Sequence, residues 1–149
     1  MKRILLLTAA IALGTAVSAQ QGNPGGHFFE NWDENADGQV TLAEATTKRG
    51  EIFFTFDEDD DGVLSASDYV IFNEARDNDH ATLEASGQRQ GRGRGPDHEN
   101  QGMTMEFNDI NGDGQVSRDE FMARTDQWFA MMDRNSDGII NRADFGRGN

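Results

Sequence analysis

Oxygen-bearing side chains recur with one spacing in four twelve-residue segments of this chain. Loop 1 is residues 33–44, loop 2 is residues 57–68, loop 3 is residues 109–120 and loop 4 is residues 133–144; they read DENADGQVTLAE, DEDDDGVLSASD, DINGDGQVSRDE and DRNSDGIINRAD. Calcium takes six to eight hard oxygen ligands at about 2.3–2.6 Å. Carboxylate or amide oxygens at positions 1, 3, 5 and 12 of each loop therefore predict four calcium sites.

The candidate ligands follow from the way a loop wraps a cation. Side chains at positions 1, 3 and 5 point inward, position 7 supplies its backbone carbonyl and position 12 closes the shell. The predicted ligands are Asp33, Asn35, Asp37, Gln39 and Glu44; Asp57, Asp59, Asp61, Val63 and Asp68; Asp109, Asn111, Asp113, Gln115 and Glu120; and Asp133, Asn135, Asp137, Ile139 and Asp144. Position 9 is expected to act through a bridging water, from Thr41, Ser65, Ser117 and Asn141.

Positions 6 and 8 distinguish this pattern from ordinary polar turns. Position 6 is glycine in all four loops, which permits a sharp turn. Position 8 is aliphatic in all four loops, as Val40, Leu64, Val116 and Ile140. Asp/Asn/Gly turns that bind nothing would have no need of an apolar residue at one fixed place. We expect position 8 to belong to a short strand that pairs with the strand of another loop.

The closing residue divides the loops into two kinds. Glu44 and Glu120 can reach an ion with both carboxylate oxygens, whereas Asp68 and Asp144 are one methylene shorter. We expect loops 1 and 3 to bind calcium more tightly than loops 2 and 4. The two loops that end in Asp are also candidates for a smaller ion such as Mg²⁺.

The loop pattern, D-x-[DN]-x-[DN]-G with a closing acid, resembles that of the EF-hand superfamily over most of residues 28–145. Loop starts within each half are only 24 residues apart. This compact spacing is similar to that of bacterial periplasmic EF-hand proteins, including the lanthanide binder lanmodulin. Lanmodulin-like chains carry Pro at position 2 and commonly Asp at position 9, neither of which occurs here; position 2 is Glu34, Glu58, Ile110 and Arg134. The resemblance implies calcium as the ion, with lanthanide binding as the alternative.

Apolar residues with helical spacing flank each loop. We therefore expect an all-α fold of four helix-loop-helix calcium loops with short β pairings, packed as a compact helical bundle. Residues 45–56 and 121–132 each suffice for one helix about 18 Å long. Two loops at opposite ends of one helix cannot pair with each other. We expect loop 1 to pair with loop 4 and loop 2 with loop 3, and the alternative is pairing between two chains in a dimer.

The N-terminus has the three parts of a secretory signal peptide. Two basic residues precede an apolar run from Ile4 to about Val17, and small residues follow. We expect cleavage after Ala19 and a periplasmic or secreted location, so residues 1–19 form the signal peptide.

The rest of the chain divides into two halves and a connection. Residues 20–86 hold loops 1 and 2, and residues 103–149 hold loops 3 and 4. Between them, residues 87–102 read GQRQGRGRGPDHENQG, which predicts a flexible linker.

Composition limits the function. The chain has 149 residues, 27 acidic against 13 basic side chains, a formal net charge of −14 and no cysteine. Such acidity argues against nucleic acid or an anionic membrane as a partner. Because disulfides cannot form, a bound metal is the expected reinforcement of a small core. No nucleophile–base arrangement or phosphate loop is visible, so we expect no enzyme.

Three roles remain open for such a protein. It could buffer calcium outside the cytoplasm, or it could be a sensor that exposes an apolar groove to a protein target. The candidate groove residues are Met122, Met131 and Met132. The third role is a protein-interaction module that calcium stabilises. The sequence leaves the protein partner and the oligomeric state open.

Overall fold

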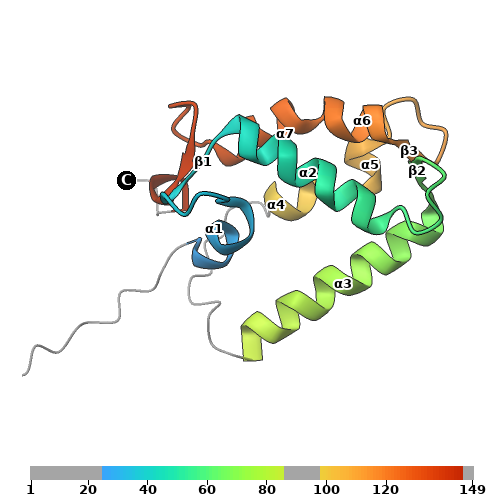
Figure 1. Ribbon diagram of the computed structural model, residues 1–149, viewed down its shortest axis with the longest axis horizontal. Helices are drawn as coiled ribbons and strands as arrows, with labels where there is room; N and C mark the ends of the chain where they lie inside the picture. Colours follow the sequence, from blue (N-terminus) through green and yellow to red (C-terminus); the bar gives the residue numbers. More distant parts are fainter. Residues whose placement is uncertain (1–24, 86–97, 146–149) are drawn as a thin grey trace, which may run out of the picture.

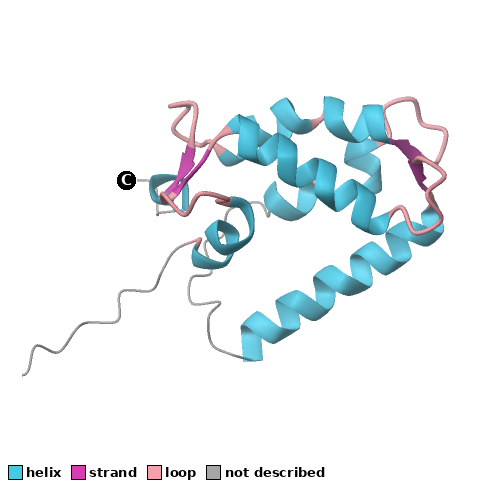
Figure 2. Ribbon diagram, in the orientation of Figure 1, coloured by secondary structure: helices cyan, strands magenta, loops and turns pink. Residues whose placement is uncertain are grey.

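The computed structural model describes residues 25–85 and 98–145. The predicted signal peptide and residues 87–97 of the predicted linker lie outside the described residues. The described chain is mostly helical, and two short antiparallel strand pairs lie at opposite ends of the molecule (Figures 1 and 2). Helices with short strand pairings between the loops confirm the predicted fold class in outline.

The elements alternate between helices and two-residue strands. In chain order they are α1 (Gly26–Trp32), β1 (Gln39–Val40), α2 (Leu42–Phe56), β2 (Val63–Leu64), α3 (Ala66–Ala85), α4 (His98–Gln101), α5 (Met105–Asn108), β3 (Val116–Ser117), α6 (Arg118–Ala123), α7 (Thr125–Met132), β4 (Ile140–Asn141) and α8 (Arg142–Phe145). None of the helices within these described ranges is both long enough and apolar enough to cross a membrane.

The strands pair across the two halves of the chain. β1 pairs with β4, which places Val40 opposite Ile140. β2 pairs with β3, which places Leu64 opposite Val116. All four position-8 side chains are fully buried. The predicted pairing of loop 1 with loop 4 and of loop 2 with loop 3 is confirmed, and it occurs within a single chain rather than between two.

Helix α2 and the α6–α7 segment connect the two ends and pack against each other (Figure 1). α2 is one continuous helix that leads from loop 1 into loop 2, as the sequence predicts. The second connection is different, because α6 ends at Ala123 and α7 begins at Thr125. The expectation of a single helix over residues 121–132 is therefore wrong.

The break between α6 and α7 has a cause in a side chain from the other half. In a continuous helix the carbonyl of Phe121 would accept a hydrogen bond from the N–H of Thr125. Instead, this carbonyl accepts a 2.7 Å hydrogen bond from Nη2 of Arg49, which projects from α2. A side chain that enters the backbone ladder is a known cause of helix kinks. Arg124, between the two helices, has φ −84° and ψ −4°.

One core, rich in aromatic residues, joins the two halves. Near β1 and β4 the rings of Trp32 and Trp128 lie 4.4 Å apart, and in the middle Phe53 and Phe121 lie 5.8 Å apart. Each of these pairs has one member from either half. The buried apolar residues are Phe28, Phe29, Trp32, Val40, Ala45, Phe53, Leu64, Tyr69, Phe72, Met103, Val116, Phe121, Trp128, Phe129, Met132 and Ile140. The halves therefore fold as one unit.

The C-terminal end of the predicted linker belongs to this folded unit. Residues 98–101 form α4, which packs against α7. Arg76 on α3 donates a 2.7 Å hydrogen bond from Nη2 to Oδ1 of Asn100. Gly102 is buried against Trp128, with no room for a side chain. The linker interpretation is therefore wrong for residues 98–102.

Two glycines provide a test of this packing. A Cβ atom added at Gly102 would overlap Cδ1 of the buried Trp128, whereas one added at Gly50 within α2 would meet nothing within 4 Å. We expect Gly102→Ala to lower the free energy of unfolding by about 3 kcal/mol through overpacking. Gly50→Ala should raise it by about 0.5–1 kcal/mol, because alanine favours the helix. Urea unfolding with calcium present would measure both, and equal effects would contradict the packing described here.

Candidate metal sites

Each of the four loops joins two helices in the same way. The preceding helix ends at the residue before position 1, and the following helix begins at position 10. The helices that precede loops 1 to 4 are α1, α2, α5 and α7, and the helices that follow them are α2, α3, α6 and α8. This regular framework brings positions 1 and 12 of each loop together at two neighbouring helix termini.

The carboxylate at position 1 organises the backbone of its loop. In loop 1, Oδ1 of Asp33 accepts a 3.2 Å hydrogen bond from the N–H of Asp37, and Oδ2 accepts a 2.8 Å bond from Gly38. Loops 2 and 4 repeat both contacts. In loop 3 the first contact shifts, and Oδ1 of Asp109 accepts from Gly112 at 2.7 Å. A carboxylate at position 1 is therefore part of the loop structure as well as a candidate ligand.

Positions 3 and 5 continue this curvature. Oδ1 of Asn35 accepts a 2.8 Å hydrogen bond from the N–H of Asp37, and Oδ1 of Asp37 accepts a 2.9 Å bond from Gln39. Loops 3 and 4 contain the same two bonds. These are Asx turns, in which a short polar side chain bonds to the backbone two residues further on. The pattern explains why Asp or Asn stands at both positions.

Loop 2 concentrates the most charge. Each of Asp57, Asp59 and Asp61 offers a carboxylate oxygen, and the three oxygens lie within 4.8 Å of one another. The other loops have Asn at position 3, so this cluster is particular to loop 2. Like charges at this distance repel one another, and a divalent cation between them would remove that cost.

The closing carboxylate at position 12 is fixed by position 9. Oγ1 of Thr41 accepts a 3.2 Å hydrogen bond from the N–H of Glu44, and Oε2 of Glu44 accepts a 2.8 Å bond from the N–H of Thr41. Ser117 and Glu120 form the same reciprocal pair. This is a capping box at the first turn of α2 and of α6.

Position 9 therefore has a structural role that our sequence analysis, which gave it only a bridging water, missed. The sequence contains the pattern of a capping box, because Thr41 and Ser117 each precede a Glu by three residues. The cap holds the carboxylate of position 12 at a set place on the helix, where a cation in the loop would meet it.

The position-12 carboxylates differ in their second oxygen. In loop 3, Oε1 of Glu120 accepts hydrogen bonds from the N–H groups of Ile110 and Asn111, both at 3.2 Å. Among the described residues, by contrast, Oε1 of Glu44 in loop 1 is buried and accepts no hydrogen bond. A buried acceptor without a partner is costly, and a cation in loop 1 would supply that partner.

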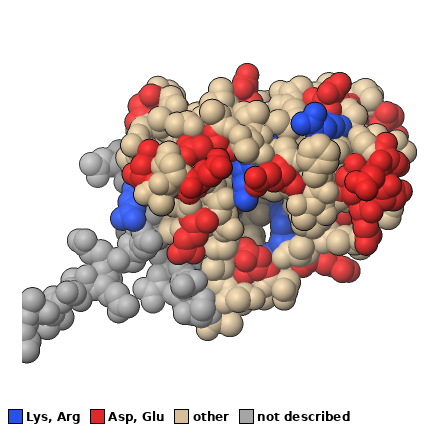
Figure 3. All heavy atoms as spheres, in the orientation of Figure 1, with Lys and Arg blue, Asp and Glu red and all other residues tan. Residues whose placement is uncertain are grey.

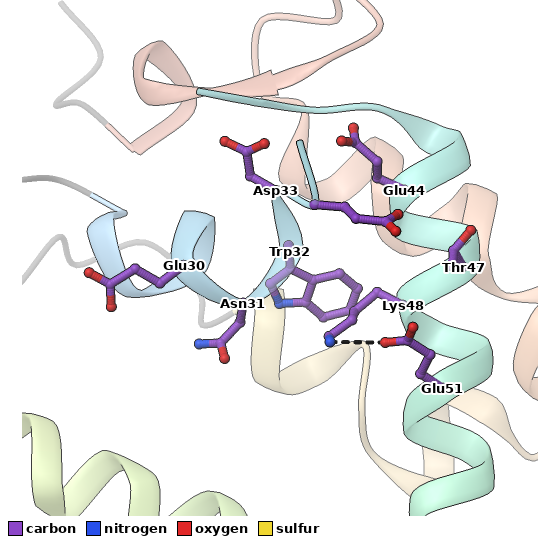
Figure 4. A pocket seen from close by; sticks show the side chains of 9 residues that line it. Glu30, Asn31, Trp32, Asp33, Glu44, Thr47, Lys48 and Glu51 are labelled. Carbon is purple, nitrogen blue, oxygen red and sulfur yellow. Dashed lines mark hydrogen bonds and ion pairs between the residues drawn. The ribbon is translucent and has the colours of Figure 1, made fainter. Parts of the chain in front are cut away.

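Loop 1 borders a hollow of about 260 Å³ between α1 and α2. Figure 4 shows Asp33 and Glu44 on the same rim of this hollow, with the ring of Trp32 below them. Lys48 and Glu51 form a 3.0 Å ion pair at its far side. The first and last predicted ligands of loop 1 therefore lie on the same side of the hollow.

Hydrogen bonds keep two of the closing carboxylates ionised. The backbone N–H and hydroxyl of Ser117 hold the pKa of Glu120 below its ordinary value. The hydroxyl of Ser65, at 2.6 Å, similarly lowers the pKa of Asp68. Both carboxylates therefore keep the ionised form, which binds a cation, to a lower pH than ordinary Asp and Glu side chains would.

A left-handed backbone conformation occurs at two positions of each loop, only one of which the sequence analysis identified. Position 6 is glycine throughout, with φ between 82° and 88°. Position 4 also has positive φ, at Ala36 (59°), Asp60 (56°), Gly112 (74°) and Ser136 (58°). Because three of these four residues have side chains, residue type gave no signal for the conformation at position 4.

Helix-loop-helix units with acidic loops, joined through pairs of short strands, define a class of calcium-binding fold. The EF hand family matches residues 105–123 and 125–148, so residues 105–148 form an EF-hand calcium-binding domain. No curated protein and no solved structure shows significant similarity to the chain. Loops 3 and 4 lie within the matched residues. Loops 1 and 2 lie outside them. The position-1 carboxylates of loops 1 and 2 accept the same backbone hydrogen bonds as the position-1 carboxylate of loop 4.

The two left-handed positions of loop 1 provide a test. A residue with a Cβ atom is strained by about 1–2 kcal/mol in this conformation. Replacing it with glycine removes that strain, but part of the gain in stability is lost because glycine increases the conformational entropy of the unfolded chain. We expect Ala36→Gly to raise the free energy of unfolding by about 0.5–1 kcal/mol. Gly38→Ala should lower it by about 1 kcal/mol, since its Cβ would meet open space and only the backbone would be strained. Thermal unfolding would measure both, and a destabilising Ala36→Gly would contradict the assignment.

Proposed function

We propose that this chain binds calcium through four EF-hand loops, two of which lie outside the matched domain. The observation that carries this proposal is the hydrogen bonding of loops 1 and 2. Their position-1 carboxylates accept from the backbone N–H groups of positions 5 and 6, as in loop 4 of the EF-hand domain. The strand pairs β1–β4 and β2–β3 also join each of these loops directly to a loop of that domain.

The ligands of each ion are the side chains at positions 1, 3, 5 and 12 and the carbonyl of position 7. Loop 2 supplies four carboxylates, and each of the other loops supplies three together with one amide. Figure 3 shows acidic side chains gathered at the end where β2 and β3 lie. These charges repel one another without a cation, so binding contributes to the stability of the folded chain. The chain takes up to four calcium ions.

Strand pairing combines the two kinds of loop. Loop 1, which ends in Glu44, pairs with loop 4, which ends in Asp144. Loop 3, which ends in Glu120, pairs with loop 2, which ends in Asp68. Each end of the molecule thus holds one site expected to be tight for calcium and one that accepts calcium or Mg²⁺.

The role that fits best is a calcium buffer outside the cytoplasm. The signal-peptide pattern of residues 1–19 supports export, and free calcium there is high enough to fill weak sites of the extracellular kind. A sensor would expose a methionine-rich groove on binding calcium. Met132 is buried in the core, and Met122 and Met131 pack against it, so these three do not form an open groove.

Calorimetric titration tests the proposal. With residues 20–149, we expect up to four calcium ions per chain, filled in a tighter and a weaker set. Glu44→Gln should remove one ion from the tighter set, because an amide cannot supply both oxygens. Glu51→Gln is a matched control on the same helix, outside the loop, and should leave the count unchanged. A count of two ions, unaffected by Glu44→Gln, would restrict binding to residues 105–148.

A hydrophobic dye separates the buffer from the sensor. A sensor exposes apolar surface on binding calcium, so dye fluorescence would rise strongly when calcium replaces a chelator. For a buffer whose methionines stay in the core, we expect fluorescence with calcium to be no higher than with the chelator. A strong calcium-dependent increase would replace the buffer role with the sensor role and leave the calcium sites in place.

A further inference from the structure

Arg49 is fully buried in the middle of the molecule. No carboxylate of residues 25–85 or 98–145 forms an ion pair with it. Its side chain instead contacts neutral groups and packs over the ring of Phe121, at 4.1 Å from the guanidinium carbon to the ring centroid. Burial lowers the pKa of Arg49 to about 10, which leaves it charged at neutral pH. Burial of a charge without an ionic partner costs folding free energy, so the hydrogen bonds of Arg49 must compensate for part of that cost.

The guanidinium connects the two ends of loop 3. Nη2 donates a 2.7 Å hydrogen bond to Oδ1 of Asn108 and another 2.7 Å bond to the carbonyl of Phe121. Asn108 directly precedes Asp109, which is position 1, and Phe121 directly follows Glu120, which is position 12. A single nitrogen from α2 thus joins the residues on either side of loop 3.

Neighbouring groups fix this arrangement. Asn108 is itself fully buried, and its Nδ2 donates to the carbonyls of Gly102 at 3.1 Å and Thr104 at 2.7 Å. These two bonds orient the amide so that its oxygen faces Arg49. Nη1 of Arg49 donates to the same Gly102 carbonyl at 3.0 Å.

Loop 3 differs in this respect from the other three loops. The residue before position 1 is Trp32 in loop 1, Phe56 in loop 2 and Met132 in loop 4, so apolar packing holds the start of those loops. In loop 3 the corresponding residue is the polar Asn108, and a hydrogen bond to the opposite half takes the place of packing.

We propose that Arg49 is a positioning residue for the calcium site of loop 3. By holding Asn108 and Phe121 to one nitrogen, it sets the separation of the helix ends that carry Asp109 and Glu120. This proposal rests on the proposed calcium binding of loop 3. It makes the affinity of that loop depend on a side chain from the other half of the chain.

Four glycine N–H groups allow each loop to be followed separately by NMR. The position-6 glycines donate to the position-1 carboxylates of their loops at 2.8–3.1 Å, so a cation on that carboxylate should shift each amide signal. The reporters are Gly38, Gly62, Gly114 and Gly138.

The variant to test is Arg49→Met, which keeps the length of the side chain and removes the hydrogen bonds. We expect the calcium concentration for half-saturation to rise roughly tenfold at Gly114 and to change at most about twofold at Gly38, as for residues that orient metal ligands. Lys48→Met is the matched control, because it removes the same charge from the same helix. The ion pair of Lys48 with Glu51 is exposed at the surface. Lys48→Met should leave Gly114 unchanged.

Arg49→Lys separates position from charge and serves also if Arg49→Met does not fold. Lysine keeps the charge but has one terminal nitrogen on a shorter side chain, so it cannot reproduce Nη2 at Asn108 and Phe121 together with Nη1 at Gly102. We therefore expect weaker calcium binding at Gly114 in this variant as well. Equal changes at Gly38 and Gly114, unchanged binding at Gly114, or tighter binding at Gly114 in Arg49→Met would overturn the proposal. If no glycine amide of the unmodified chain responds to calcium, it is the proposed function that fails.

Discussion

The length of the connection between two successive loops determines most of this structure. In the first half, α2 takes up the whole distance from loop 1 to loop 2, so these two loops lie at opposite ends of a rigid rod. Their strands cannot reach each other, and each short strand leaves backbone groups that need a partner. The other half of the chain supplies these partners, running in the opposite direction. The single core, the burial of Val40 and Leu64, and the contact of Trp32 with Trp128 all follow from this constraint.

The charge of the loops is managed by the backbone rather than by basic side chains. Asp57, Asp133 and Asp144 are all largely buried, yet the two ion pairs His27–Asp79 and Lys48–Glu51 of the described residues involve none of these three carboxylates. Backbone N–H groups contact the carboxylates instead, and each loop curls around the cluster that these contacts create. The same backbone contacts hold the carboxylates of a loop close together, at the place where a cation would bind.

Much of the fold could be predicted because one short pattern fixes both chemistry and geometry. Glycine at position 6 and an aliphatic residue at position 8 located the turns and the strands, and the spacing of the loops gave their pairing. The interruption at Arg124 was not predictable, since it arises where Arg49 from a distant helix occupies a backbone carbonyl. Residues 98–102 were misjudged for a similar reason. Their composition indicates a linker, but Gly102 is needed where the backbone meets Trp128.

Pairing across the halves has a consequence for assembly. One half by itself would present two short strands without the partners that the other half supplies. In the intact chain the two partners are covalently joined, so their association is intramolecular. Folding then does not depend on how dilute the protein becomes. The paired loops therefore persist at any protein concentration, whereas a complex of two separate half-length chains would dissociate on dilution.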